Sequence, residues 1–487
     1  MMVLTYSKSS SHLIRRSKRL NRILTLCVII VWNSSIYAQN VDPIQRYSTI
    51  EKTASKWMQV PELFVQNDKV QAEISASGTS QKPGWIANAL NWYKTKTLPG
   101  DLQFHGFVSQ GYIVTTDNDV FGNSDNGGSF GFTEAGLNVS LRPLPRLLVS
   151  AQMLSRRAGE GNTGMPRLDY GFLDYRLYSH EANQFGIRVG RLKNPFGFYN
   201  DTRDMAFTRP SILLPQSIYF DRTRNLGLSG DSVQLYGDAA VSSWGTFSTQ
   251  FGVWLPIVTD GDTEISLLGT RPSQSLGHLN RDVSYIGRGL FESNDKSIRL
   301  AISGIWLNSS YDPNNRLKDP MGPGAFQFTP IYFSAQYNTE RWSLTGEYAL
   351  RSFKYDNNFG LDVKGEKNNP LNGLDMTGES FYVQGDYRFN PKWEGFIRYD
   401  VFFADRSDRN GSKWVAEDSI KRKGLEHSRY ARDFTVGLRW NITPEFMLRA
   451  EYHHVNGTGW LSRLDNPIPA QTVNEWDLFA IQASYRF

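Results

Sequence analysis

The sequence contains almost no cysteine. Cys27 is the single cysteine among 487 residues, and it lies in an apolar stretch near the start of the chain. A chain cleaved beyond this stretch would have none, which excludes disulfides, thiolate metal sites and cysteine nucleophiles. Because Leu26 occupies the position where a lipoprotein signal needs a small residue, we do not expect a lipid anchor at Cys27.

Long hydrophobic runs are also missing. The apolar stretch Ile23 to Trp32 is shorter than the roughly 20 residues that a membrane-spanning helix requires, and no later run approaches that length. The mean hydropathy of −0.44 is that of an average soluble protein. A transmembrane β-barrel has a similarly low mean, because its strands alternate apolar and polar residues. The composition therefore argues against spanning helices after residue 38 but leaves a barrel open.

Acidic residues are absent from the N-terminal segment. Six bases precede an apolar run and a short polar stretch that ends at Ala38: Lys8, Arg15, Arg16, Lys18, Arg19 and Arg22. This order is that of a secretory signal, so residues 1–38 are predicted to be a signal peptide; an uncleaved anchor is the alternative. Removing these six from the 53 bases leaves 47 against 48 acids. The mature chain is nearly neutral, and the pI of 9.0 gives no reason to expect a nucleic-acid partner.

Residues 39–100 lack the regular pattern of the later residues. Ile44 to Trp57 could form a short helix, and Ser75 to Pro83 has the composition of a linker. The segment is too short to plug an active transporter, so we interpret it as a periplasmic N-terminal arm.

From Leu102 onwards, apolar and polar residues alternate with a period of two. In one segment Phe381, Val383 and Gly385 alternate with Tyr382 and Gln384. Such alternation predicts a strand with one apolar face. Sixteen strands are expected, at 102–115, 131–142, 147–156, 168–178, 184–193, 231–238, 244–254, 283–292, 297–308, 329–338, 342–353, 380–389, 393–403, 433–442, 446–455 and 477–487. The sixth is short, and the eighth has Ile286 and Leu290 on its polar face.

The connections between these strands alternate in length. Short turns such as 143–146, 339–341 and 443–445 follow even-numbered strands, whereas long segments such as 117–128, 356–378 and 405–431 follow odd-numbered ones. Short turns at one end and long loops at the other are typical of outer-membrane barrels, and a β-sandwich has no reason to keep this order. With aromatic residues at 13%, enough for two interfacial girdles, the sequence predicts an all-β, sixteen-stranded antiparallel transmembrane barrel over residues 101–487.

The chain ends in Tyr485-Arg486-Phe487. A terminal Phe with an aromatic residue two positions earlier resembles the assembly signal of outer-membrane barrel proteins, and it implies the barrel assembly machinery as a partner. The alternative is a strand that simply ends the chain.

The longest connection is expected at 195–230. The junction between the strand before it and its first residues reads Gly190-Arg191-Leu192-Lys193-Asn194-Pro195-Phe196-Gly197-Phe198-Tyr199. This junction resembles that of porins in the broad phosphate-selective and related anion-porin group. The resemblance implies a loop folded into the lumen, a homotrimer, contact with outer-membrane lipid and lipopolysaccharide, and small hydrophilic solutes as cargo. The dense ladder of bases that phosphate selectivity requires is not found.

Charged residues supply the candidate pore sites. The expected constriction residues are Arg203, Asp204, Arg209, Asp221, Arg222 and Arg224, and the expected pore-wall residues are Arg176, Arg188, Arg388, Arg398 and Arg439. Charges in a narrow aqueous opening set ion preference, because a low-dielectric wall strengthens their field. Mixed signs suit small hydrophilic solutes with a weak lean towards anions. A solvated or internally ion-paired loop is the alternative.

Two further functions remain open. Tyr170, Phe172, Tyr236, Tyr382, Phe396 and Phe402 occupy polar-facing positions. They could form a path for sugars or aromatic compounds, although a membrane-interface girdle is favoured. Gly230-Asp231-Ser232 could indicate a barrel enzyme, but no partner histidine motif accompanies it. Neighbouring His453 and His454 point to opposite faces of a strand and cannot share a metal, and neither cofactor nor metal is expected.

The export signal yields the first prediction. The mature protein should begin at Gln39 and fractionate with the outer membrane, because the basic and apolar segments end before Ala38. N-terminal sequencing of the membrane-extracted protein checks this. Finding Met1 or Ser7 within the mature protein would contradict it.

Overall fold

A computed structural model describes residues 102–258, 261–269, 277–314, 319, 322–357, 359, 371–418 and 422–487. The expected signal peptide and periplasmic arm lie outside the described residues. No helix within the described ranges is long and apolar enough to cross a bilayer.

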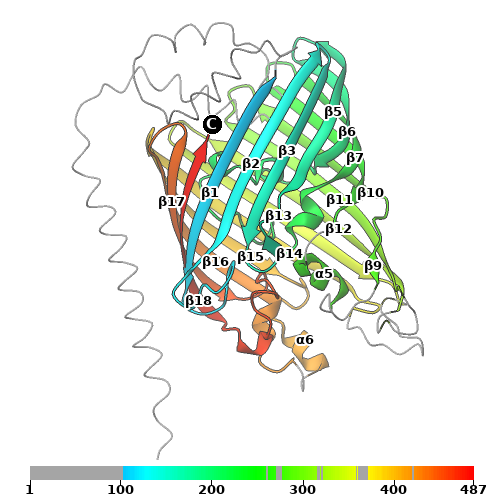
Figure 1. Cartoon of the computed structure of the whole chain (residues 1–487), viewed down its shortest axis with the longest axis vertical. Helices are drawn as coiled ribbons and strands as arrows, with labels where there is room; N and C mark the ends of the chain where they lie inside the picture. Colours follow the sequence, from blue (N-terminus) through cyan, green and yellow to red (C-terminus); the bar gives the residue numbers. More distant parts are fainter. Residues whose placement is uncertain are drawn as a thin grey trace, which may run out of the picture.

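One antiparallel sheet closes on itself as a barrel (Figure 1). Its strands are β1 Gln103–Thr115, β2 Ser129–Leu144, β3 Leu147–Ala158, β5 Arg167–His180, β6 Asn183–Lys193, β7 Ser229–Val241, β8 Gly245–Pro256, β10 Ser284–Ser293, β11 Ile298–Asp312, β12 Gly324–Asn338, β13 Trp342–Tyr355, β14 Asp375–Asn390, β15 Trp393–Phe403, β16 Tyr430–Asn441, β17 Phe446–Gly457 and β18 Glu475–Arg486. The two-residue strands β4 Asn162–Thr163 and β9 His278–Leu279 only add to β3 and β11. The wall therefore has the sixteen strands that the sequence predicted.

The strand order along the wall follows the sequence, and β18 pairs with β1 in the register Phe107↔Arg486 to Thr115↔Leu478. This last pairing leaves the wall without an open edge, which is the condition for placing β-strands in lipid. The remaining elements belong to the connections: η3 Asn200–Thr202, η4 Ala206–Thr208, α4 Arg224–Leu228, α5 Gly261–Leu268, α6 Ser412–Glu417, η6 Glu426–Arg429 and η7 Pro469–Gln471.

Connection lengths alternate as the sequence predicted. Two residues join β14 to β15, whereas residues 404–429 join β15 to β16. Figure 1 shows the C-terminus at one end of the barrel and α5, α6 and β9 at the other. The short turns thus share one end, and the long loops share the opposite end.

Several strands extend further towards the long loops than the alternation indicated. β14 begins at Asp375 instead of residue 380, and Asp375 still pairs with Lys354 of β13. β7, expected to be short at 231–238, is longer at both ends and runs from Ser229 to Val241. Backbone hydrogen bonds between strands continue beyond the part of the wall that faces lipid. The paired strands are therefore longer than the segments in which apolar and polar side chains alternate.

Apolar side chains cover the outside of the barrel, and polar ones fill its inside. Val383 is 51% exposed on β14, whereas its inward neighbour Gln384 is 3% exposed. Trp393 and Trp440 stack with ring centroids 5.0 Å apart beside the short turns, where an aromatic girdle is expected. This arrangement is the reverse of a water-soluble protein and defines a lipid-facing wall.

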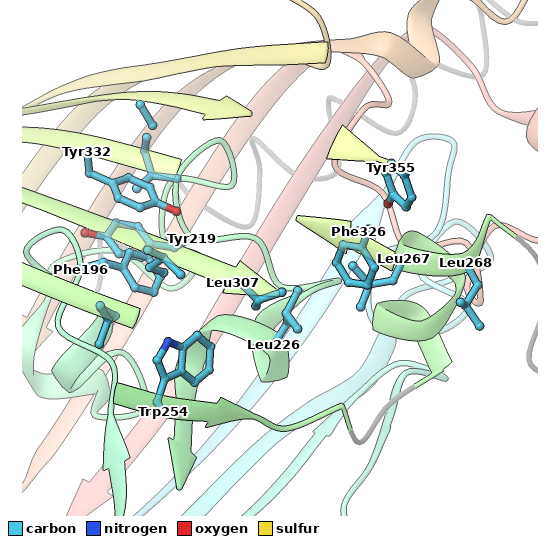
Figure 2. Packing of buried hydrophobic residues seen from close by; sticks show 14 of the residues in the cluster. Phe196, Tyr219, Leu226, Trp254, Leu267, Leu268, Leu307, Phe326, Tyr332 and Tyr355 are labelled. Atoms are coloured by element: carbon cyan, nitrogen blue, oxygen red, sulfur yellow. The ribbon is translucent and has the colours of Figure 1, made fainter. Parts of the chain in front are cut away.

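The buried apolar residues form two clusters inside the barrel, where connections pack on the wall. Figure 2 shows part of one, with Phe196, Tyr219 and Leu226 of a connection beside Trp254 and Tyr332 of the strands. Ile286, which disturbed the alternation of β10, belongs to this cluster at 1% exposure. Its place is explained by contact with an internal loop instead of water.

The seam between β1 and β18 yields a testable prediction. Phe487 exchanges two backbone hydrogen bonds of 3.0 Å with Gly106, and its ring occupies the space that a Cβ on Gly106 would need. Phe487→Ser should reduce the yield of heat-modifiable, membrane-inserted barrel several-fold, since it removes the ring that packs on the closing seam and the aromatic residue of the expected assembly signal.

Phe389→Ser is the matched control, because Phe389 is 57% exposed at the short-turn end of β14, away from the seam. Gel mobility of unheated outer-membrane fractions measures both variants. Equal amounts of folded barrel in the two would contradict the special role given to Phe487.

Candidate functional site

The connection between β6 and β7, residues 194–228, lies inside the barrel and is called the internal loop below. It contains η3, η4 and α4, and most of its residues between Ser211 and Tyr219 are buried. Its polar contacts reach strands from β10 round to β17. The loop thus folds inwards, as the resemblance to porins implied. A buried connection must find partners for its backbone polar groups, and the inner wall supplies them.

Glu347 of β13 is one anchor of the internal loop. Its buried carboxylate accepts hydrogen bonds from the Phe198 N–H at 2.9 Å and from the Tyr219 hydroxyl at 2.6 Å. From the wall itself, the Ser334 and Tyr382 hydroxyls donate to the same group at 2.6 and 2.8 Å. Four donors around one carboxylate compensate for its removal from water.

Glu451 of β17 is a second anchor, at a distant point of the wall. Its two oxygens accept the N–H groups of Ile212 and Leu213 at 2.7 and 2.8 Å. His453 lies between Glu451 and Asp433, with ring nitrogens 3.0 and 2.8 Å from their carboxylates. Both ring nitrogens of this buried histidine therefore lie at hydrogen-bond distance from carboxylate oxygens of the wall.

Arginines of the wall hold the carbonyl groups of the same loop segment. Arg398 of β15 donates to the Leu213 carbonyl at 3.2 Å. Arg449 of β17 donates to the carbonyls of Ala206 and Arg209 at 3.1 and 3.2 Å, and also to that of Ser211. Carboxylates therefore bind the loop's N–H groups, and guanidinium groups bind its C=O groups.

Aromatic packing supports the other side of the internal loop. The ring of Phe196 stacks with those of Tyr219 of the loop and Tyr332 of β12, at centroid distances of 5.9 and 5.0 Å; the three rings are grouped together in Figure 2. Further along, Phe220 meets Phe402 of β15 edge-on at 5.2 Å, and the Arg351 guanidinium lies over both rings. These contacts fix the loop against the wall at several points.

Most of the expected constriction residues are buried in ion pairs and hydrogen bonds instead of facing water. Arg203, Asp204, Arg209 and Arg224 are each at most 4% exposed. Arg224 and Lys193 pair with Asp204. Asp221 pairs with Arg156 of β3 at 2.8 Å and with Arg203 at 3.6 Å, and Arg209 donates to loop carbonyls.

Arg222 is the exception among these arginines. It is only partly buried, its guanidinium lies 5.9 Å from the centre of the Phe220 ring, and it lines a pocket at the long-loop end. Burial, followed by the charges of Arg463 and Arg429, lowers the pKa of Arg222 to about 10. It stays positively charged at neutral pH and contributes to the field at the pocket.

The five expected pore-wall arginines occupy different surroundings. Arg188 pairs with Asp174 at 2.9 Å and lies over Tyr236, while Arg176 is half-buried on β5. Arg398 does not line water, because it is 1% exposed beneath the internal loop. Arg388 and Arg439 remain partly accessible near the short turns and share Glu394 at 3.9 and 3.7 Å.

The structure corrects the assignment of several aromatic residues to a membrane-interface girdle. Tyr236, Tyr382, Phe396 and Phe402 are at most 6% exposed and lie on the inner side of the wall. Their alternation placed them correctly on the polar face. The internal loop covers Tyr382 and Phe402, whereas Tyr236 and Phe396 pack on neighbouring side chains of the wall. His453 and His454 lie on opposite faces, the former 1% exposed and the latter largely in the open.

The anchoring roles of Glu347, Glu451 and Arg449 were not foreseen from the sequence. The alternation placed all three on the inner face, but their partners lie between 128 and 243 positions away in the chain. No local spacing signals such a contact. Among the described residues, no group of three His, Cys, Asp or Glu side chains could hold a metal ion.

A closed antiparallel barrel with a lipid-facing exterior and an internal loop defines an outer-membrane β-barrel protein. No family model and no curated protein matches the chain. Among solved structures it is similar to an anion-selective porin from Comamonas acidovorans, with 13% identity and a TM-score of 0.48 over 80% of this chain and 99% of that one.

It is also similar to the outer-membrane channel DcaP of Acinetobacter baumannii, with 11% identity and a TM-score of 0.48 over 80% of this chain and 99% of that one. Salmonella typhi OmpF, in a complex with daunomycin, gives 13% identity and a TM-score of 0.47 over 80% and 98%. Similarity at this level does not identify an activity.

The Glu451 anchor yields a testable prediction. Glu451→Ala should release the internal loop, because it leaves the Ile212 and Leu213 N–H groups without an acceptor, at about 1–3 kcal/mol for each buried donor. The arginines of the loop should then become accessible to trypsin in the folded barrel. Mass spectrometry of the digest measures cleavage within residues 203–224.

Glu394→Ala is the control, since Glu394 contacts Arg388 and Arg439 of the wall near the short turns. It should leave the internal loop resistant. Equal resistance of the Glu451 variant would mean that this carboxylate does not hold the loop.

Proposed function

We propose that the protein is an outer-membrane porin through which small hydrophilic solutes and ions diffuse passively, with a weak preference for anions. The observation that carries the proposal is the contrast between the two sides of the wall. Apolar side chains face lipid, while charged side chains face an interior crossed by a loop. An interior of this kind offers solutes a polar surface inside a lipid-compatible shell.

The anion preference rests on the accessible charges near the short turns. Arg388 and Arg439 share the single carboxylate of Glu394, at 3.9 and 3.7 Å. Asp386 lies close to Arg388 and Glu394 but is only 7% exposed, so the charges that water reaches here are two cations and one anion. This positive excess at the water-filled side is strengthened by the low-dielectric wall. Elsewhere charges are matched more closely, as between Arg288 and Asp201 at 2.6 Å. A weak preference is therefore expected instead of strict selectivity.

A channel is favoured over an enzyme by the surroundings of Gly230-Asp231-Ser232. Asp231 forms ion pairs with Arg191 at 2.9 Å and Arg281 at 2.5 Å. Ser232 faces inwards from β7 beside Gln234. Asp231 lies on the opposite face of β7 from Ser232 and is held by two arginines, so it does not form a catalytic pair with that serine. By the same proposal, the partners are outer-membrane lipid and lipopolysaccharide, the barrel assembly machinery and two further copies in a homotrimer.

The charge preference yields a testable prediction. Replacing Arg388 and Arg439 together by Gln should shift the reversal potential in a salt gradient towards cations. The shift should be larger near 0.01 M salt, where the Debye length is about 30 Å, than near 1 M, where it is about 3 Å. Planar-bilayer recordings of the purified full chain measure it.

Lys354→Gln is the matched control, because Lys354 lies at the long-loop end of β13 with its side chain 67% exposed. It should change the reversal potential much less. A double variant with an unchanged reversal potential would place the selectivity elsewhere, and a purified chain that conducts no ions would overturn the porin proposal itself.

A further inference from the structure

A pocket lies above the internal loop at the long-loop end of the barrel and is called the mouth pocket below. It has a volume of about 430 Å³, including the part open to solvent. Residues from five separate connections and from β3 line it, among them Phe121, Arg156, Arg222, Asp262, Trp460 and Asp465. A solute entering from this end meets these side chains before it reaches the internal loop.

One part of the lining contains buried hydrogen-bond donors that have no acceptor. Arg156 is 4% exposed, and Trp460 is 6% exposed. Two nitrogens of Arg156 hold Glu134 and Asp221 at 2.9 and 2.8 Å, but its Nη1 has no partner, and neither has Trp460 Nε1. The Nε of Arg222 is also without a partner. A ligand that satisfies these groups must supply acceptor atoms.

Another part of the lining is acidic. Asp119, Asp262 and Asp465 border the pocket, as does Asp221, whose charge is paired with that of Arg156 at 2.8 Å. Burial, together with the charges of Asp262 and Asp119, raises the pKa of Asp465 to about 6. The hydrogen bonds to the first three aspartates come from neutral groups, such as the Ser462 hydroxyl to Asp262 and the Glu160 N–H to Asp465 at 2.9 Å. A positively charged group here would relieve their mutual repulsion.

Between the charged groups the pocket is apolar. Val120, Phe121, Leu213 and Leu461 contribute to its lining. The rings of Phe121 and Trp460 are fixed from behind by Phe132 and Trp476, at centroid distances of 4.8 and 5.4 Å. A rigid apolar surface suits a compact apolar group on the ligand.

We propose that the mouth pocket binds a zwitterionic solute, an α-amino acid with an apolar side chain. Its carboxylate would accept from Arg222, Arg156 and Trp460, and its ammonium would pair with the aspartates. A simple carboxylate would satisfy the donors but would bring no cation to Asp119 and Asp465, and a neutral sugar would bring neither charge. Arg222 and Asp262 already attract each other, so the zwitterion adds one charge of each sign to a mixed-charge lining. The inference rests on the proposed porin function and names a solute class for it.

Leucine is the probe, measured by its interruption of ion current through the full chain in planar bilayers. Isocaproate lacks the ammonium of leucine, isopentylamine lacks its carboxylate, and glucose is a neutral polyol. Leucine should interrupt the current at concentrations at least about tenfold lower than any of the three, since each missing charge-assisted contact costs about 1.5–3 kcal/mol.

Substitutions in the mouth pocket test whether leucine blocks the current by binding there. Arg222→Gln and Asp262→Asn should each weaken leucine block about tenfold, and Trp460→Phe should weaken it while keeping an aromatic ring. Arg422→Gln and Trp414→Phe are matched controls, because these residues contact each other through their side chains near α6 and do not line the pocket. Both controls should keep the block of the unmodified protein.

Three results would overturn the inference: no leucine block, equal block by isocaproate or glucose, or block that persists in the Arg222 and Asp262 variants. In each of these cases the ion current without solute continues, so the proposed porin function would stand. Loss of the current itself would instead refute the porin.

Discussion

Every strand of this protein depends on the hydrogen-bonded ladder that joins β18 back to β1. Lipid offers no partner to a backbone N–H or C=O, so a sheet with a free edge cannot lie in a bilayer. The register from Phe107↔Arg486 to Thr115↔Leu478 removes that edge. Gly106 and Phe487 complete it with two backbone bonds and a ring laid over a residue that has no side chain. Closure in turn creates an interior, and the interior makes an internal loop possible.

The internal loop follows the same rule inside the barrel. Its buried backbone N–H and C=O groups need hydrogen-bond partners, as those of the wall do. Because the loop is irregular, these groups cannot pair with a neighbouring strand. Side chains of the wall replace the ladder. Glu347 and Glu451 accept from its N–H groups, and Arg398 and Arg449 donate to its carbonyls. This explains why so many charged residues of the inner face are buried, and why few remain to meet a passing solute.

Charge is therefore divided between two tasks. Arg203, Arg209 and Arg224 stabilise the loop from within, where removing one partner of an ion pair would leave a buried charge. Arg222, Arg388 and Arg439 remain accessible, at the two ends of the barrel. The number of charged residues on the inner face therefore does not indicate the ion selectivity of the pore. Selectivity depends on the few charges that water and solutes can reach.

The sequence by itself determined the number of strands, which side of each faces lipid, and the alternation of short and long connections. These features are local: side-chain direction repeats every two residues, and lipid requires one apolar face wherever a strand crosses it. The same local rule placed Ile286 and Tyr382 on the inner face, but it could not say whether water or a loop would cover them.

Only the tertiary structure decided which inner-face residues hold the loop and which remain accessible. The contacts that settle this, such as Glu347 with Tyr219 or Glu451 with Ile212, join residues more than a hundred positions apart. They arise because a closed barrel brings opposite walls within reach of one loop. The spacing of residues along the sequence does not indicate which of them become neighbours in this way. The alternation therefore predicted the face on which each charged residue lies but not its partner.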